Sequence, residues 1–310
     1  VLPDSTVISK QYDPRSIGDY PVLIKANDYV VGTRDYDPLM RISRTTVGGR
    51  TEHFRYEQAQ TVPSSKVTPS GVAVNFTLDP LFQSEVAERH VTRNGNLRTR
   101  FSRDTLSGQL LQASSPLSHE GFHYSDSGKL KRKEYLIGDQ KFESTYTYSL
   151  MGIPIKIIDV MGNERRYYYN SIGRIERIEQ GAILTVYSYD SEGVLKTVRV
   201  SDTKVGRSLL TTLSYDAFGR EVQRVFKLND DPEQVLEQTF TAEDKLQRRR
   251  LLLESVILRD EKFQYDVRGR LSRYQCSGSQ SPVDAWGKAI LSQDYEHDYL
   301  DNILTLKTRF

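Results

Sequence analysis

Short runs in which apolar or aromatic residues alternate with polar residues recur along the chain. Isoleucine occupies every second position of residues 153–157, and residues 271–273 begin another alternating run. Successive side chains of a β-strand point to opposite faces of the sheet, so this alternation predicts strands with one face wetter than the other. The pattern therefore predicts many short strands.

A longer motif accompanies these strands. It reads aromatic, any residue, Tyr, then Asp, Asn or Ser, two residues, Gly, a basic or apolar residue, and an apolar residue. The clearest copies are residues 187–195, 213–220 and 263–271, with weaker copies at 122–130, 146–152 and 167–175. The central Tyr or its substitute stands at positions 36, 56, 78, 103, 124, 148, 169, 189, 215, 265 and 297, and most spacings are 20–26 residues.

The spacing within the motif predicts a β-hairpin. Aromatic residues two positions apart share one face of a strand, while Asp and Gly three positions apart fit the first and last positions of a type I turn. Glycine supplies the left-handed conformation of a three-residue loop closed by a bulge, and Asp accepts hydrogen bonds from turn amides. The predicted turn residues are Tyr148, Gly152, Tyr169, Asn170, Gly173, Tyr189, Asp190, Gly193, Tyr215, Asp216, Gly219, Tyr265, Asp266 and Gly269.

Repetition of such hairpins predicts an all-β fold. A single hairpin is marginal in water, so neighbouring copies are expected to stack their aromatic side chains and form one twisting, spiralling antiparallel sheet. We expect one repeat domain over residues 1–310, with an irregular lead-in over residues 1–30 and an insertion over residues 273–296. The start at Val1 and the absence of a signal-peptide pattern suggest a piece of a longer polypeptide.

Composition narrows the function classes. The 310 residues are 37% hydrophobic and include 19 Tyr against 11 Phe and 1 Trp, which favours half-buried β surface. A net charge of +2 gives no general attraction to nucleic acid or to anionic lipid, and no apolar stretch suits a spanning helix. The basic clusters are predicted to be solvated strand faces: Lys129, Lys131, Arg132 and Lys133, and Arg248 to Arg250.

One segment of the chain matches a catalytic signature. The segment His119, Glu120, Gly121, Phe122, His123 fits the His-Glu-x-x-His pattern of zinc proteases, in which a helix brings both histidines to one metal and the glutamate acts as base. Here the segment is in register with the repeat, and a strand would hold the two histidines about 13 Å apart. We therefore prefer coincidence, with a zinc peptidase that uses Glu134 or Glu143 as third ligand as an alternative.

Other candidate chemistry is weaker, and no cofactor or catalytic residue is predicted. Asn229, Asp230, Asp231 and Glu233 lack the spacing of a calcium loop, while Asp298 and Asp301 occupy turn positions. Cys276, the single cysteine, cannot form a disulfide within the chain and is predicted to be a structural thiol. Trp286 lies outside the repeat register, so an aromatic glycan-binding platform stays an alternative.

These copies resemble the YD repeats of the Rhs family and of the shell-forming B and C components of insecticidal Tc toxins. The likeness covers roughly residues 30–310, and residues 276–288 followed by Asp301, Asn302 and Ile303 look particularly similar. Members of these families usually end in a core segment that carries a self-cleaving aspartyl motif near an Asp-Pro-x-Gly sequence. The Asp-Pro pairs at residues 13–14, 37–38, 79–80 and 231–232 lack its glycine, so cleavage is not carried over.

The resemblance implies a β-sheet ribbon that spirals into a hollow, cocoon-like shell around a toxic C-terminal polypeptide. The expected function is therefore structural encapsulation in a secreted bacterial toxin. Expected partners are further repeats of the same or a partner shell chain, the enclosed toxin and a secretion or translocation component, without nucleic acid or membrane insertion. The alternatives are a cell-surface adhesion or glycan-binding module and, third, the zinc peptidase.

Overall fold

The fold is entirely β in a computed structural model that describes residues 1–16, 19–82, 84–92 and 97–310. The described residues form strands, turns and loops without any helix, and so without a helix long and apolar enough to cross a membrane. The all-β class predicted from the alternating runs is confirmed.

The chain divides into two compact units, residues 1–162 and residues 163–310, which are described separately. The first unit contains β1 (Ile8–Tyr12), β2 (Pro21–Ala26), β3 (Tyr29–Tyr36), β4 (Ile42–Val47), β5 (Arg50–Arg55), β6 (Ser65–Val67), β7 (Ala73–Leu78), β8 (Val86–Val91), β9 (Leu97–Arg103), β10 (Leu110–Ser114), β11 (Ser118–Tyr124), β12 (Leu130–Ile137), β13 (Gln140–Tyr148) and β14 (Pro154–Ile158). The second contains β15 (Glu164–Tyr169), β16 (Ile175–Gln180), β17 (Ile183–Tyr189), β18 (Leu195–Asp202), β19 (Arg207–Tyr215), β20 (Glu221–Leu228), β21 (Gln234–Phe240), β22 (Leu246–Leu253), β23 (Val256–Tyr265), β24 (Leu271–Ser277), β25 (Ser292–His297) and β26 (Ile303–Arg309).

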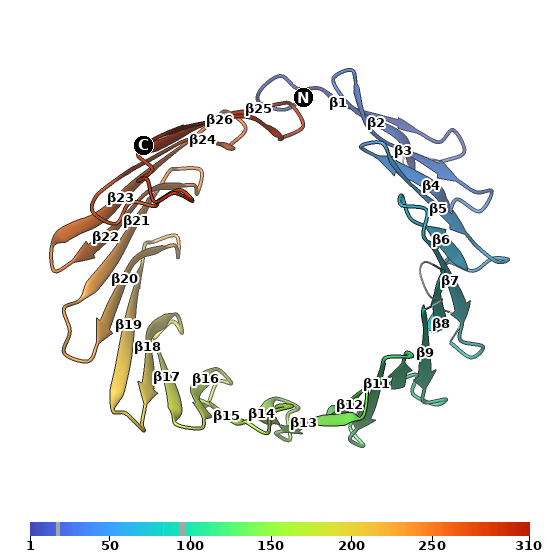
Figure 1. The fold of residues 1–310 in the computed structure, drawn as a ribbon, viewed down its shortest axis with the longest axis horizontal. Coiled ribbons are helices and arrows are strands. Elements are labelled where there is room, and N and C mark those ends of the chain that lie inside the picture. Colours follow the sequence, from blue (N-terminus) through green and yellow to red (C-terminus); the bar gives the residue numbers. More distant parts are fainter. Residues whose placement is uncertain (17–18, 83, 93–96) are drawn as a thin grey trace. The chain divides into compact units, whose positions relative to one another are not determined.

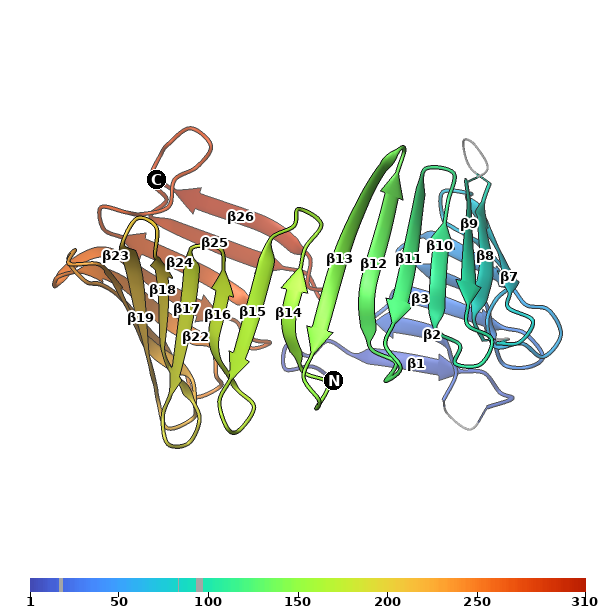
Figure 2. The same cartoon turned by 90° about the horizontal axis from the view of Figure 1, so that it is seen from below.

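Within each unit, every strand pairs antiparallel with the strand that follows it in the chain (Figure 1). Figure 2 shows this order clearly for β7 to β13, which lie side by side as successive hairpins. The predicted antiparallel hairpin repeat is confirmed. Because strand follows strand in this way, the turns from odd to even strands of each unit lie at one edge of its sheet, which we call the Asp edge. The turns from even to odd strands form the opposite edge.

The predicted lead-in is not irregular throughout. β1 and β2 pair with each other, and their connecting turn begins at Asp13, whose Oδ1 accepts the Arg15 backbone N–H at 2.9 Å. Tyr12 precedes Asp13 as in the motif, but Ser16 stands where the motif has glycine, so the sequence pattern did not include this turn. The single-domain interpretation stays a prediction, although both units consist of the same hairpins.

The predicted insertion at 273–296 is shorter than expected. Its first residues belong to β24 and its last to β25, which leaves residues 278–291 as an excursion from the opposite edge. A bridge between Val283 and Ala289 closes a small hairpin inside this excursion, and Gly287 donates to the Asp284 carbonyl at 3.1 Å. The excursion therefore contains a miniature copy of the repeat turn.

The hairpins form one layer without a covering layer. Among the described residues, the only buried apolar side chains are Ala26, Leu213, Tyr274 and Cys276. The accessible area is 20343 Å², whereas a compact monomer of this mass would expose about 13,000 Å². Contacts between adjacent strands and adjacent turns must therefore supply most of the stability.

Candidate functional site

The Asp edge carries the predicted turn residues, and Asp216 shows how each turn is built. Its Oδ1 accepts the backbone N–H groups of Phe218 at 2.9 Å and Arg220 at 3.0 Å. Gly219 donates to the Asp216 carbonyl at 3.0 Å with a φ of +78°, and the strand register shifts at Tyr215. The carboxylate thus holds a tight turn that only a residue tolerant of positive φ completes without strain.

The other predicted turns have the same geometry. Asn170 caps the N–H groups of Ile172 and Arg174, and Asp190 and Asp266 cap the equivalent amides of their own turns. In the copy that has Ser149, the shorter side chain accepts the N–H of Ile153 at 3.2 Å. Positive φ angles occur at the predicted glycines Gly152, Gly173, Gly193, Gly219 and Gly269.

The tyrosine of the motif ties its hairpin to the preceding hairpin. The Tyr189 hydroxyl donates to the carbonyl of Ile175, the first residue of β16, at 2.7 Å, and Tyr265 reaches Leu246 at the start of β22 at 2.9 Å. The same link joins Tyr36 to Pro21, Tyr56 to Ile42 and Tyr124 to Leu110. The bond gives the motif tyrosine a structural role that a phenylalanine could not fill, because phenylalanine has no hydroxyl to donate.

We expect Tyr189→Phe to lower the free energy of unfolding by about 1 kcal/mol, the usual net value of one hydrogen bond. The matched control is Tyr187→Phe in the same strand, whose hydroxyl has no partner among the described residues. Urea denaturation followed by circular dichroism measures both variants. Equal effects of the two substitutions would contradict the proposed role of the Tyr189 hydroxyl.

A second link joins each hairpin to the following hairpin and is made by the side chain of the residue after the glycine. Arg270 pairs with Asp266 of its own turn at 2.7 Å and donates to the carbonyl of Asp298 in the next turn at 2.6 Å. Arg41 and Arg220 make equivalent bonds to carbonyls of their next turns. The motif includes a basic residue at this position, but the sequence did not predict a bond from this residue to the next turn. Its partner depends on how the hairpins lie side by side.

These basic side chains also lie over the aromatic ring of the following repeat. The Arg41 guanidinium is 4.4 Å from the Tyr56 ring centroid, and Arg220 is 5.0 Å from that of Phe240. Ring pairs occur as well, such as Tyr20 with Tyr36 at 5.3 Å. Cation–π contacts between successive copies thus accompany an edge-to-face ring pair, and the strand-face pattern did not predict these cation–π contacts.

Acid should weaken the Asp216 turn. The hydrogen bond from Arg220, followed by the two backbone N–H groups, lowers the pKa of the Asp216 carboxyl below its ordinary value of 3.8. A lowered folded-state pKa stabilises the protein above the unfolded value, and that contribution is lost as pH falls through the folded value. Asp216→Asn should therefore be less stable than the wild type at neutral pH, with a gap that closes below about pH 4. Urea midpoints across pH measure it, and a gap independent of pH would contradict it.

The zinc-like segment lies in β11, not in a helix. Its His119 contacts the Gln112 amide at 3.0 Å, while His123 lies 3.7 Å from Glu134, a carboxylate that also pairs with Arg132. Glu143 pairs weakly with the same arginine at 3.8 Å. The described residues contain no group of three or more His, Cys, Asp or Glu side chains placed to hold a metal ion. The helical geometry on which the zinc interpretation depends is therefore missing.

The remaining sequence candidates have structural partners. The Asn229 side chain accepts the Ser208 N–H at 2.8 Å in the turn that also contains Asp230 and Asp231. Asp298 caps the N–H groups of its own turn, and Asp301 pairs with Arg270 at 2.9 Å. The basic residues of the cluster at 248–250 each pair with a carboxylate on a neighbouring strand.

A buried charged network beneath the excursion was not found from the sequence. Glu261 is only 4% exposed and accepts two bonds from Arg249, at 2.6 and 3.0 Å, and one from the Tyr274 hydroxyl at 3.0 Å. Burial alone would raise the pKa of the Glu261 carboxyl, but Arg249 outweighs it and lowers that pKa. Cys276 is buried beside them, and its thiol is 3.6 Å from the Ser281 hydroxyl.

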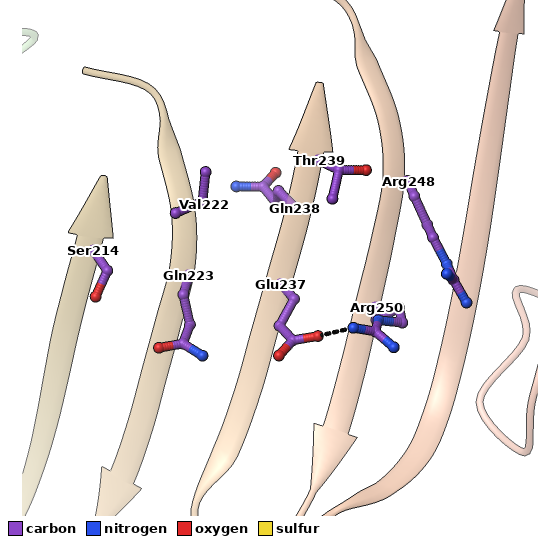
Figure 3. A pocket seen from close by; sticks show the side chains of 8 residues that line it. All are labelled: Ser214, Val222, Gln223, Glu237, Gln238, Thr239, Arg248 and Arg250. Carbon is purple, nitrogen blue, oxygen red and sulfur yellow. Dashed lines mark hydrogen bonds and ion pairs between the residues drawn. The ribbon is translucent and has the colours of Figure 1, made fainter. Parts of the chain in front are cut away.

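A shallow polar hollow of about 370 Å³ lies on the sheet of the second unit (Figure 3). Glu237 and Arg250 form an ion pair on adjacent strands within it, and Gln223 stands beside Glu237 on β20. The other side chains that line it are Ser214, Val222, Gln238, Thr239 and Arg248. These groups offer hydrogen bonds to solvent but form no set of residues suited to acid–base or nucleophilic catalysis.

No protein-family model and no curated protein sequence matches the chain. Solved structures do match it. The crystal structure of TcdB2–TccC3–Cdc42 aligns with 94% of this chain at a TM-score of 0.63 and 12% identity. The chain shares the fold of TcdB2–TccC3. The structures of TcdB2–TccC3–TEV and of TcdB2–TccC3 align with 98% and 95% of the chain, at TM-scores of 0.61 and 0.62 and 13% identity.

The likeness to TcdB2–TccC3 agrees with the resemblance to shell-forming Tc toxin components at the level of the fold. It extends over nearly the whole chain, so both units have counterparts in the matched structures. The chain spans only 18–19% of the length of the matched TcdB2–TccC3 chains. The shared fold alone therefore does not show what this chain encloses or binds.

Proposed function

We propose that the chain is a structural segment of a β-sheet shell that encloses a toxic polypeptide in a secreted bacterial toxin. The observation that carries the proposal is the fold shared with TcdB2–TccC3 over 94–98% of the chain. The proposed partners are further repeats of the same or a partner shell chain, the enclosed polypeptide and a delivery component.

The single-layer architecture supports this role. A globular enzyme of this length would bury a substantial core, whereas this sheet leaves most side chains on both faces at least partly accessible. Its hairpins are joined through tyrosine–carbonyl and arginine–carbonyl bonds at the Asp edge. A wall of linked hairpins keeps its continuity without a covering layer, as a container requires.

Limited proteolysis of the natural gene product that contains these residues tests the proposal. We expect a polypeptide outside the repeats to survive protease as long as the sheet is folded, and to be degraded once urea unfolds the sheet. Mass spectrometry of the surviving fragments identifies the protected segment. Degradation of every segment outside the repeats while the sheet stays folded would overturn the proposal.

A second candidate, glycan binding, is favoured by one observation. Trp286 is 85% exposed at the tip of the excursion hairpin, where its backbone N–H donates to the Asp284 carboxylate at 2.9 Å. An exposed indole on such a turn is a suitable platform for a sugar ring. Saturable binding on a glycan array that Trp286→Ala abolishes would favour adhesion, and an array without any binding would remove this candidate.

A further inference from the structure

The strands β1 and β26 each have one open edge. Among the described residues, β1 pairs only with β2, and β26 pairs only with β25. All five residues of β1 are exposed. An open edge presents backbone N–H and C=O groups that can pair with a further strand. Both edges are therefore candidate contacts with another chain.

One half of the tyrosine–carbonyl link is present at each of these strands. Tyr12 stands directly before Asp13 and at a register shift, as the motif tyrosines do. Its hydroxyl has no partner in the described part of the chain, whereas Tyr36 of the next hairpin donates to the carbonyl of Pro21, the first residue of β2. The equivalent carbonyl of the last hairpin belongs to Ile303, the first residue of β26, and no described tyrosine bonds to it. A donor without an acceptor and an acceptor without a donor thus lie in the first and last hairpins.

The existing links set the register of the strands that they join. In the link from Tyr189 to Ile175, the residue three before the tyrosine lies opposite the residue two after the acceptor. The link from Tyr265 to Leu246 has the same register. A strand that accepts the Tyr12 hydroxyl is therefore expected to lie in this register.

This register would make the open edges of β1 and β26 complementary. Ile8 would lie opposite Leu306. Lys10 would lie opposite Leu304. Backbone bonds alternate along an antiparallel pair, so those of Ile8 and Lys10 point away from β2, because Val7 bonds to it at 2.8 Å. The last hairpin has the same register after its bulge, so the backbone groups of Leu304 and Leu306 point away from β25. The side chains of Ile8 and Leu306, whose residues are 42% and 49% exposed, would also cover each other.

We propose that β1 of one copy of this chain pairs antiparallel with β26 of a second copy, with the Tyr12 hydroxyl bonded to the Ile303 carbonyl. A second copy is the occupant because the chain itself carries both halves of the link. The inference names the surface through which the proposed shell segment meets further repeats, and in that respect it rests on the proposed function. Its test uses the purified chain, whereas protease protection is measured on the natural gene product, so either result can fail without the other.

Sedimentation velocity over a wide range of concentrations measures the association. A contact between unlike surfaces of identical chains leaves one surface of each kind free, so we expect the wild type to form a series of oligomers that grows with concentration. Tyr12→Phe should associate about fivefold more weakly, because one hydrogen bond is lost. The matched control is Tyr187→Phe, which should associate as the wild type does. A wild type that is monomeric at every concentration, or equal association of the two variants, would overturn the proposal.

Proline substitutions test which edges meet. Lys10→Pro and Leu306→Pro each remove an N–H that the register directs at the other copy, and both leave the bonds to β2 and β25 in place. Each variant keeps one open edge, so each should be monomeric alone, while an equal mixture should form a dimer with one copy of each. Circular dichroism that matches the wild type verifies that both are folded. Association of either variant alone, or a mixture that stays monomeric, would overturn the pairing of β1 with β26.

Discussion

Replacement of Glu261 with alanine is expected to lower the free energy of unfolding by about 2–3 kcal/mol, the range for loss of a hydrogen-bonded, buried charged acceptor. The substitution removes the acceptor of the Tyr274 hydroxyl, which is buried, and of the Arg249 guanidinium, whose side chain is 35% exposed. Arg259, 3.4 Å from the same carboxylate, also loses its partner. Urea denaturation followed by circular dichroism measures the change.

The control is Glu296→Ala, which removes an ion pair with Lys307 whose side chains are 62% and 68% exposed. Ion pairs in such positions contribute less than about 1 kcal/mol. Glu261→Gln adds an intermediate, since its amide oxygen accepts a hydrogen bond but carries no charge. Similar losses in Glu261→Ala and Glu296→Ala would show that the buried network does not stabilise this part of the sheet.

Gly278→Ala is expected to detach the excursion at residues 278–291 from the sheet. An added Cβ would lie 2.3 Å from the Leu258 carbonyl oxygen and 2.8 Å from its carbon, and the φ of +119° is strained for any other residue. The Gln280 N–H bond to that same carbonyl, at 2.8 Å, would break as the segment moves. We expect a loss of about 2 kcal/mol or more.

The buried Cys276 thiol reports this change. A thiol reagent should label it at least about tenfold faster in Gly278→Ala than in the wild type, since each 1.4 kcal/mol of lost protection corresponds to a factor of ten. Gly287→Ala is the matched control, because its φ of +80° is similarly unusual but no atom lies within 4 Å of the added Cβ. Equal labelling of the two variants would contradict a close approach at Gly278.

The local motif predicted the hairpins because all of its determinants lie within a few residues. Asp216, Gly219 and Tyr215 are neighbours in the sequence, and the capping bonds that they make depend only on the turn itself. The same reasoning missed the turn at Asp13, where Lys10 stands in place of the first aromatic residue and Ser16 in place of the glycine. The turn still forms, because the Asp13 carboxylate accepts the Arg15 N–H and its carbonyl accepts the Ser16 N–H, both at 2.9 Å.

Contacts between hairpins were harder to predict from the sequence. Arg270 and Asp298 are 28 residues apart, and Glu261 meets Arg249 and Tyr274 from different strands. Such pairs depend on the strand register, because a shift of one residue would move every side chain of a strand to the other face of the sheet. The excursion is shorter than predicted, since residues 273–277 alternate polar and apolar residues as a strand does and continue β24, with Tyr274 and Cys276 buried.

The links at the Asp edge have a consequence for changes in chain length. Each tyrosine–carbonyl and arginine–carbonyl bond spans one hairpin only, so deletion of two consecutive strands brings together ends that carry the same complementary groups. Deletion of a single strand would instead reverse the direction of every later strand and exchange its two edges. Natural variants of this sequence, and engineered ones, should therefore gain or lose strands in pairs.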